Sequence, residues 1–360
     1  MKIIDIYIIK KFLGTFFYAI SLLILIVIIF DVSENIDSFI KNQAPFKAIV
    51  VDYYINFIPY FINLFIYLFT FISVIFFTSK MASDTEIIAI LSSGVSFWRF
   101  LKPYLMASVF LAVLSFYLGN FLIPRTNHAR RIFKNTYMEK LTKDNDRNIH
   151  VQIEPGVFVY IESFNSEKMN GRRFSLEKFE DQRLVYKIMG DKLSWDKTTG
   201  KWKIKSWFER KLDSTGTQMI YSKGKELDTI MNLKPSDLYQ IKEDYEEMNF
   251  WELNNYIARE KEKGSIAFKK YEIEKYKRIA GPSAIIILTF IGVALSSRKV
   301  RGGIGMHLGL GIGLTFSYIL LMQLSTVFST MGNLPPSLGA WIPNFIYALI
   351  GIYLLIKAPK

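Results

Sequence analysis

The sequence of 360 residues contains no cysteine and only three histidines, which lie in different regions. Without cysteine there is no disulfide framework, so any exported domain must be stable through its core alone. The Cys and His spacings of a zinc site are also absent. We therefore interpret His128, His150 and His307 as surface or packing residues rather than ligands, and we expect no metal site in this chain.

The chain also lacks the parts of a nucleotide-binding or hydrolytic enzyme. No Gly-x-x-x-x-Gly-Lys-Ser/Thr segment is present, and the glycine-rich segment 302–305 is not followed by Lys-Ser/Thr. Serine, histidine and acid are not grouped as a nucleophilic triad. We expect no catalytic residue and no cofactor in this chain, so the energy for any work it performs must come from elsewhere.

Charge is missing from long stretches of the chain, which is 51% hydrophobic with a mean hydropathy of +0.20. Residues 12–30 carry no charge, and about fourteen of them are Ile, Leu, Val or Phe. Insertion of such a run into a bilayer is favourable by about 7 kcal/mol, at roughly −0.5 kcal/mol per apolar residue. Its length is close to the ~20 residues that cross the hydrocarbon. A signal peptide is the alternative, but the run is too long and no small-residue cleavage site follows it.

Five further runs have the same character, so we predict a polytopic α-helical membrane protein with six transmembrane helices. The later spans are residues 54–77, 97–123, 279–297, 304–328 and 338–356. Pro59 interrupts the second span. In the fifth span, Gly305, Gly309 and Gly313 have the small-xxx-small spacing that lets membrane helices approach closely, and we predict that they pack against another helix.

Lysine and arginine in the short connections predict the orientation. They lie before the first span, around the connection between the second and third, between the fourth and fifth, and after the sixth: Lys2, Lys10, Lys11, Lys80, Arg99, Lys102, Arg298, Lys299, Arg301, Lys357 and Lys360. We therefore predict that both termini are cytoplasmic and that the long insert between spans three and four is periplasmic. The basic balance of the insert does not oppose this, because long domains translocate largely regardless of charge.

The insert, residues 124–277, differs sharply in composition from the spans around it. A basic, helix-like stretch precedes short alternating runs, and turn signals separate these runs. The stretch is 125–143, and the runs are 150–162, 173–179, 184–195, 201–212 and 218–222. We predict an antiparallel sandwich or β-jellyroll. From Ser236 the pattern is helical again, with Asn249 as an N-cap, Glu252 at N3 and a stop at Gly264. The predicted domains are 1–123, 124–277 and 278–360.

The short connection between spans two and three has the pattern of an amphipathic helix over about residues 83–94. Ser83 and Glu86 fit a capping box, Ile87 begins an apolar face, and Gly94 ends the helix before Ser96 caps the next one. Such a helix is expected on the cytoplasmic surface of the membrane. It is either a plain connector, in which Glu86 satisfies a backbone N–H, or a docking element for a cytoplasmic partner.

Four segments stand in a characteristic order along the chain. They are Thr85-Glu86-Ile-Ile-Ala89-Ile-Leu-Ser-Ser93-Gly94-Val-Ser96, Tyr276-Lys-Arg278-Ile-Ala280-Gly-Pro282, Arg298-Lys-Val-Arg301-Gly-Gly303, and Gly332-Asn-Leu-Pro335-Pro336-Ser-Leu-Gly-Ala340-Trp341-Ile-Pro343-Asn344. With the six-span layout and central insert, they make the chain resemble the LptF/LptG (YjgP/YjgQ) permeases over essentially its whole length. The acidic stretch 30–37 after the first span is more similar to the LptG branch.

The resemblance implies a membrane subunit of the ABC transporter that extracts lipopolysaccharide from the bacterial inner membrane. It implies an LptF/LptG heterodimer, an LptB-like cytoplasmic ATPase dimer that binds ATP and Mg, an LptC-like bitopic protein and a periplasmic bridge that includes the jellyroll. No nucleic acid takes part. It also implies that Glu86 contacts the ATPase from a coupling helix, with Ser83, Thr85, Ala89 and Gly94 in the same segment.

Recognition of lipid phosphates requires basic residues near the periplasmic mouth of the cavity that the family forms between its subunits. The candidates here are Arg130, Arg131 and Lys134, just past span three, and Lys41, beyond span one. The same residues fit a solvated or headgroup-facing basic surface equally well.

Acidic residues stand at the outer end of span one, where the resemblance implies basic groups. They are Asp31, Glu34 and Asp37. We hypothesise that the bound lipid is less phosphorylated, or that divalent cations bridge these acids to it.

Two other classes of protein remain open from the residues alone, a secondary transporter and a ligand-binding membrane receptor. Secondary transporters usually keep ionisable residues or broken helices at mid-membrane. The predicted spans are nearly free of charge at their centres, and Pro59 is their main interruption. Neither class needs a cytoplasmic ATPase.

Overall fold

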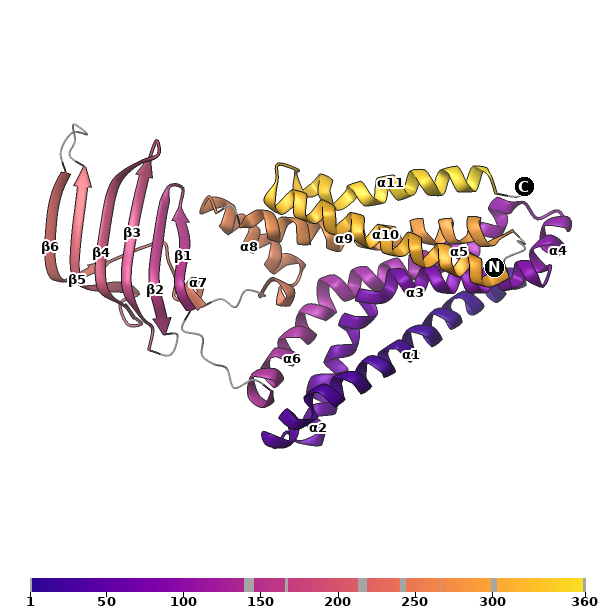
Figure 1. Cartoon of the computed structure of the whole chain (residues 1–360), viewed down its shortest axis with the longest axis horizontal. Coiled ribbons are helices and arrows are strands. Elements are labelled where there is room, and N and C mark those ends of the chain that lie inside the picture. Colours follow the sequence, from indigo (N-terminus) through magenta and orange to yellow (C-terminus); the bar gives the residue numbers. More distant parts are fainter. Residues whose placement is uncertain are drawn as a thin grey trace. The chain divides into compact units, whose positions relative to one another are not determined.

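Figure 1 shows the computed structural model of the chain. The structure describes residues 2–138, 146–165, 168–212, 219–239, 244–265, 267–298 and 303–358. The chain forms two compact units. The helical unit comprises residues 1–140, 246–250 and 269–360, and the sheet unit comprises residues 141–245 and 251–268.

Six helical segments of the described chain are long and apolar enough to cross a membrane, which confirms the predicted polytopic fold. They are α1 (Ile3–Lys41), α3 (Ile55–Ser83) with the preceding α2 (Phe46–Ala48) and η1 (Ile49–Tyr54), α5 (Phe97–Tyr117) with the following η2 (Leu118–Leu122) and α6 (Ile123–Tyr137), α9 (Phe268–Ser296), α10 (Gly303–Met331) and α11 (Pro336–Ile356). Most of these segments extend beyond the apolar run that predicts them, because the chain stays helical in flanking polar sequence. The predicted helical stretch 125–143 is helical to Tyr137, and residues 139–143 lie outside the described part.

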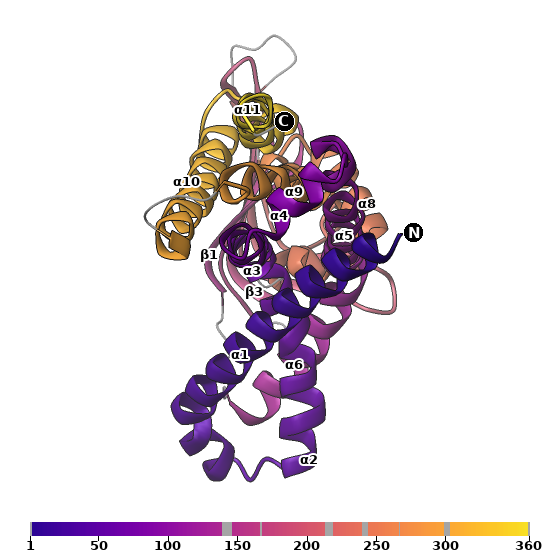
Figure 2. The ribbon, with the colours of Figure 1, turned by 90° about the vertical axis from the view of Figure 1, so that its right-hand side faces the viewer.

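The helix α3 lies at the centre of the helical unit, with α1 and α10 packed against it (Figures 1 and 2). Two glycines permit the close approach of its neighbours. A Cβ at Gly292 of α9 would press on Val74 of α3, and a Cβ at Gly311 of α10 would overlap Ile75. Small residues at such contacts let membrane helices pack closely through dispersion forces, where the hydrophobic effect gives no drive.

The three glycines predicted from their spacing do not make this contact. Among the residues that the structure describes, nothing lies within 4 Å of a Cβ added at Gly305, Gly309 or Gly313. Gly311 faces α3 instead, because two residues along a helix correspond to about 200° of rotation. The small-residue stripe therefore lies on a face of α10 that the described part of the chain leaves uncovered, and its packing remains a prediction for another helix.

A buried asparagine joins three of the spans. Asn344 of α11 donates through its side-chain amide to the Ala280 carbonyl of α9 at 2.7 Å and to the Ser283 hydroxyl at 2.9 Å. Its amide oxygen accepts from the Tyr318 hydroxyl of α10 at 2.8 Å. Buried polar groups are costly when unpaired, so these bonds specify how α9, α10 and α11 pack.

The sheet unit contains six described antiparallel strands that follow one another in chain order. They are β1 (Asp146–Glu154), β2 (Val157–Asn165), β3 (Asn170–Glu180), β4 (Arg183–Asp196), β5 (Lys201–Leu212) and β6 (Met219–Thr229). The predicted run 150–162 is in fact parts of two strands, because the chain turns at Pro155 and Gly156, and Gly156 has a φ of +76°. The predicted antiparallel β-fold between the third and fourth spans is confirmed.

The core of the sheet unit is centred on Trp202, whose indole N–H donates to the Leu233 carbonyl at 2.8 Å. Ile161, Leu193 and Ile204 are buried in the same cluster. The helical segments after the sheet are α7 (Ser236–Tyr239), η3 (Asp244–Glu247) and α8 (Phe250–Glu262). As predicted, α8 begins directly after Asn249 and ends before Gly264, which has a φ of +71°.

Candidate functional site

The connection between the second and third spans contains the short helix α4 (Glu86–Ser92), which begins later than predicted. Ser83 is the last residue of α3, and Thr85 has a left-handed φ of 61° directly before α4. The interpretation of Ser83 as the cap of this helix is therefore wrong. The last turn of α3 stays helical because Met81 and Ala82 are buried in the core of the helical unit.

The two faces of α4 differ in exposure. Ile87 is 1% exposed and belongs to the core of the helical unit, whereas Ile88 is 55% exposed. Thr85 and Ala89 are exposed as well. As predicted, Gly94 follows the helix, with a φ of +87°, and the Ser96 hydroxyl caps α5 by accepting from the Arg99 N–H at 3.3 Å. The helix thus has a buried apolar anchor and an outward face available for docking.

The first two turns of α1 contact both sides of this connection. The Tyr7 hydroxyl donates to the Glu86 carboxylate, with oxygen distances of 3.1 and 3.3 Å. Asp5 forms a two-pronged ion pair with Arg99 of α5, at 2.7 and 2.8 Å. Sequence reasoning missed these contacts, because the partners are 79 and 94 residues apart and no local pattern connects them.

At the other end of the helical unit, the predicted phosphate-binding residues have different surroundings. The Arg130 guanidinium lies over the rings of Phe57 and Tyr60, 5.8 and 5.4 Å from their centres. Arg131 is 2.6 Å from the carboxylate of Glu247. Arg131 therefore forms an ion pair with an acid of its own chain. The cation–π contacts of Arg130 hold its side chain in place without adding a negative charge next to it.

The remaining two candidates lie at helix ends that meet. Lys41 is exposed in the last turn of α1, and Lys134 is partly buried in the last turn of α6. The side-chain amide of Asn42 donates to the Tyr137 carbonyl at 2.8 Å, which brings these two helix ends together. Lys41 and Lys134 are thus on the same side of the helical unit.

The acidic stretch of α1 has a structural member. Asp31 accepts hydrogen bonds from the hydroxyls of Tyr53 at 3.1 Å and Tyr54 at 3.0 Å, both in η1. Glu34 and Asp37 are exposed on the same helix. Asp31 therefore attaches the outer part of α1 to the start of the second span. A divalent cation that bridges to lipid needs exposed carboxylates, and within this acidic stretch those are Glu34 and Asp37.

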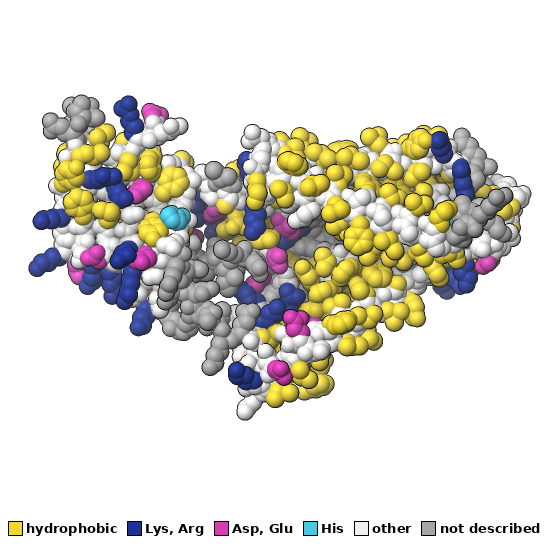
Figure 3. All heavy atoms as spheres, in the orientation of Figure 1, with side chains coloured by type: hydrophobic (Ala, Val, Ile, Leu, Met, Phe, Trp, Pro, Cys, Tyr) yellow, Lys and Arg dark blue, Asp and Glu magenta, His cyan; other side chains and the backbone are white. Residues whose placement is uncertain are grey.

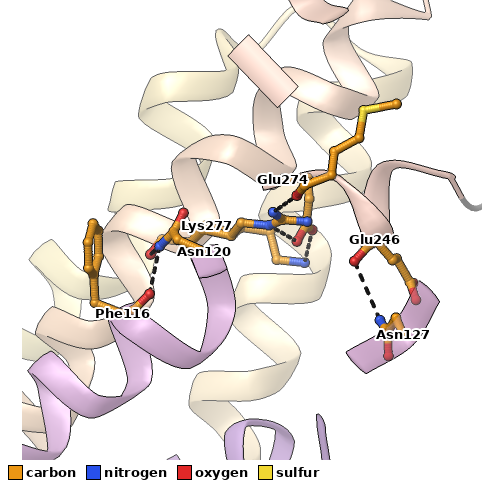
Figure 4. Close-up of polar contacts among 8 residues, drawn as sticks. Phe116, Asn120, Asn127, Glu246, Glu274 and Lys277 are labelled. Carbon is orange, nitrogen blue, oxygen red and sulfur yellow. Dashed lines mark hydrogen bonds and ion pairs between the residues drawn. The ribbon is translucent and has the colours of Figure 1, made fainter. Parts of the chain in front are cut away.

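A short segment, residues 246–250, is held against the helices by three side chains, and Figure 4 shows one of the contacts, between Asn127 and Glu246. The Asn127 amide donates to the Glu246 carbonyl at 3.4 Å, and Arg278 donates to the Met248 carbonyl at 2.8 Å. Arg131 pairs with Glu247 between them. The helical unit thus keeps this segment although its sequence neighbours belong to the sheet unit.

Arg278 belongs to the segment Tyr276–Pro282 quoted above, and both its carbonyl and its side chain have polar partners in the structure. Pro282 has no N–H for the Arg278 carbonyl four residues earlier. The side-chain amide of Asn120, which donates to the Phe116 carbonyl at 2.9 Å (Figure 4), also donates to the Arg278 carbonyl at 3.5 Å. The Arg278 side chain pairs with Glu274 at 3.3 Å.

A cavity of about 370 Å³ opens beside these residues in the helical unit. Helices α3, α5, α6, α9 and α10 line it, and its polar members include Asn63, Glu274, Lys277 and Gln323. Lys277 is 3.8 Å from Glu274, so the charges at this end of the cavity largely compensate one another. No group of three or more His, Cys, Asp or Glu residues able to hold a metal ion occurs among the residues that the structure describes.

Six apolar helices able to cross a membrane, one short helix between spans and a sheet unit define a multi-pass membrane protein. The chain belongs to the lipopolysaccharide export system permease family LptF/LptG, whose family model matches residues 6–357. Two relatives are both named lipopolysaccharide export system permease protein LptG, from Escherichia coli strain K12 and Escherichia coli O6:H1 strain CFT073. Each is 20% identical over 283 residues, which are 77% of this chain and 77% of the relative. The family predicted from the quoted segments is confirmed.

Proposed function

We propose that this chain is an LptG-like permease subunit that pairs with an LptF-like paralogue to extract lipopolysaccharide from the inner membrane and pass it toward the outer membrane. An LptB-like ATPase dimer, which binds ATP and Mg, supplies the energy. The observation that carries the proposal is α4. It has a buried anchor in Ile87, an exposed face around Ile88 and Ala89, and Glu86 at its first position.

The proposed orientation places α4 and both termini in the cytoplasm and the sheet unit in the periplasm. Figure 1 shows the two chain ends beside α4 at one end of the helical unit. Lys2, Lys80 and Lys102 lie in or near the connections at this end, as the positive-inside rule requires. The orientation prediction also used Lys299, Arg301 and Lys360, which lie outside the described residues.

The partner subunit and the lipid are proposed to cover apolar faces of α1 and α10. Side chains such as Leu25 and Ile29 of α1, and Phe316 and Leu320 of α10, are exposed in this chain. Apolar side chains cover much of the helical unit in Figure 3. A membrane solvates such faces equally well, so a paralogue and an LptC-like bitopic protein bind there through shape and small residues rather than through hydrophobicity.

For the lipid phosphates we propose Arg130, Lys134 and Lys41, with Arg131 in a supporting role because of its ion pair with Glu247. Arg130 is already oriented by two aromatic rings. A planar guanidinium binds phosphate through paired hydrogen bonds. Glu34 and Asp37 are compatible with a bound lipid that carries fewer phosphates, or they bind a divalent cation that bridges them to the lipid.

Co-purification tests the proposal against a secondary transporter or a receptor. The full chain, expressed with its envelope partners, is expected to retain a Walker-type ATPase, and purified complex in vesicles should extract lipopolysaccharide only with ATP. Glu86→Ala and Glu86→Lys should weaken the complex and lower export, whereas Glu34→Ala on exposed α1 should leave ATPase binding intact. Absence of an ATPase, with normal export by both Glu86 variants, would contradict the proposal.

A further inference from the structure

Two polar attachments connect the beginning of α1 to the two sides of α4. Tyr7 binds Glu86 at the first position of α4, and Asp5 binds Arg99 in the first turn of α5, the next helix along the chain. We propose that these attachments fasten α4 and the start of α5 to α1, so that a displacement of this connection moves α1. Tyr7, Asp5 and Arg99 are then positioning residues for transport. The inference rests on the proposed function, in which the ATPase docks on α4.

The attachments resist relative motion for distinct physical reasons. The Asp5 carboxylate is 8% exposed and meets Arg99 through two parallel bonds, a geometry that fixes direction as well as distance. Removal of one partner would leave a largely buried charge unpaired. The Tyr7 ring packs edge-on against Phe77 of α3, which orients its hydroxyl toward Glu86.

The apolar face of α4 belongs to the same buried core as the first turns of α1. Ile87 of α4 is buried in the same cluster as Ile8 and Phe12 of α1. Protein interiors are close-packed, so a shift of Ile87 displaces its neighbours instead of compressing them. The polar attachments and this shared core therefore involve the same turns of α1.

The helix α1 is suited to move as a unit. Only 17% of the residues in its most apolar stretch are buried within this chain, compared with 61% for α9. Its 39 residues form one continuous helix, which corresponds to about 58 Å and exceeds the thickness of a bilayer. At its far end it is attached again, through Asp31 to Tyr53 and Tyr54. A force applied at Tyr7 is thus delivered to the opposite side of the membrane.

The amount of lipid extracted per ATP hydrolysed distinguishes a role of these residues in coupling from a role in stability alone. Tyr7→Phe removes a single hydroxyl and keeps the ring beside Phe77, and Asp5→Asn keeps the shape of the ion pair. In the reconstituted complex, each variant is expected to lower lipid extracted per ATP hydrolysed by about fivefold, the lower end of typical coupling effects. Tyr18→Phe, on an exposed part of α1, is the matched control. The exchange Asp5→Arg with Arg99→Asp should restore part of the ratio.

Spin labels measure the attachment itself, and the absence of native cysteine makes the labelling specific. Labels at Ile3→Cys of α1 and Ser92→Cys of α4 occupy exposed positions. Their separation should be narrowly distributed and independent of nucleotide in the complex, and it should broaden in the Tyr7→Phe, Asp5→Asn double variant.

The two hypotheses fail differently. A wild-type complex that extracts lipid with ATP, together with a normal transport ratio and an unchanged label distribution in the variants, overturns the inference alone. A wild-type complex without ATP-driven extraction overturns the proposed function, and the inference with it.

Discussion

The guanidinium of Arg131 lies 2.6 Å from the carboxylate of Glu247, so one of the basic residues predicted for lipid binding is paired within its own chain. The pair holds the segment 246–250 on α6, next to the bonds from Asn127 and Arg278. Arg131 therefore has a role in stability that is independent of lipid.

Substitution at this pair should lower stability even in lipid-free detergent. Both side chains are partly exposed, so we expect Arg131→Gln and Glu247→Gln each to cost about 1 kcal/mol, with a double variant no worse than either single one. Thermal unfolding of the four proteins gives the coupling energy. Additive losses would show that the two side chains act independently.

The hydrogen bonds from Tyr53 and Tyr54 make Asp31 the structural member of the acidic stretch. Asp31→Asn weakens both bonds to a charged acceptor, and we expect a loss of about 2 kcal/mol in the free energy of unfolding. Glu34→Gln and Asp37→Asn, at exposed positions, should be close to neutral in the same denaturation assay. Equal losses at all three positions would refute this distinction.

Two glycines of α10 should respond oppositely to the same substitution. Gly311→Val overlaps Ile75 and is expected to destabilise the subunit by about 1–3 kcal/mol. Gly309→Val has open space around its Cβ and should leave the isolated subunit stable, but it should weaken heterodimer formation. Unfolding of the single subunit and size-exclusion of the co-expressed pair measure the two effects. A stable heterodimer with Gly309→Val would remove the stripe from the proposed interface.

Asn344 should be among the most sensitive polar positions of the spans. Asn344→Leu keeps the volume but leaves the Tyr318 hydroxyl and the Ala280 carbonyl without these partners, at a cost of about 2–3 kcal/mol. Phe345→Leu, at the next and exposed position, is the control. Detergent thermal shift compares them, and equal midpoints would contradict the assigned role of Asn344.

The six spans were predictable because hydropathy is a local property of the chain. The helix boundaries were less so, since burial of Met81 and Ala82 extends α3 past the serine that resembles a cap. The packing of Gly305, Gly309 and Gly313 stays a prediction, and the sequence did not indicate Gly311, because which glycine packs in this chain depends on the face that α3 covers.

The candidate site was predictable only where its residues are contiguous. The segment around Glu86 is short and carries a family pattern, so the sequence located α4. Tyr7 and Asp5 are ordinary residues of a first helical turn, and their partners are distant in sequence. Similarly, nothing in the sequence indicates that Arg131 meets Glu247, because the whole sheet lies between them in the chain.

ATP-driven motion is proposed to enter this chain at α4, and site-specific photocrosslinking tests this proposal most directly. A photoreactive residue at Ile88, on the exposed face of α4, is compared with one at Leu349, which is exposed on α11. In membranes that contain the native complex, the account predicts that position 88 crosslinks to the ATPase and position 349 does not. A functional complex in which position 88 gives no ATPase crosslink would contradict the account.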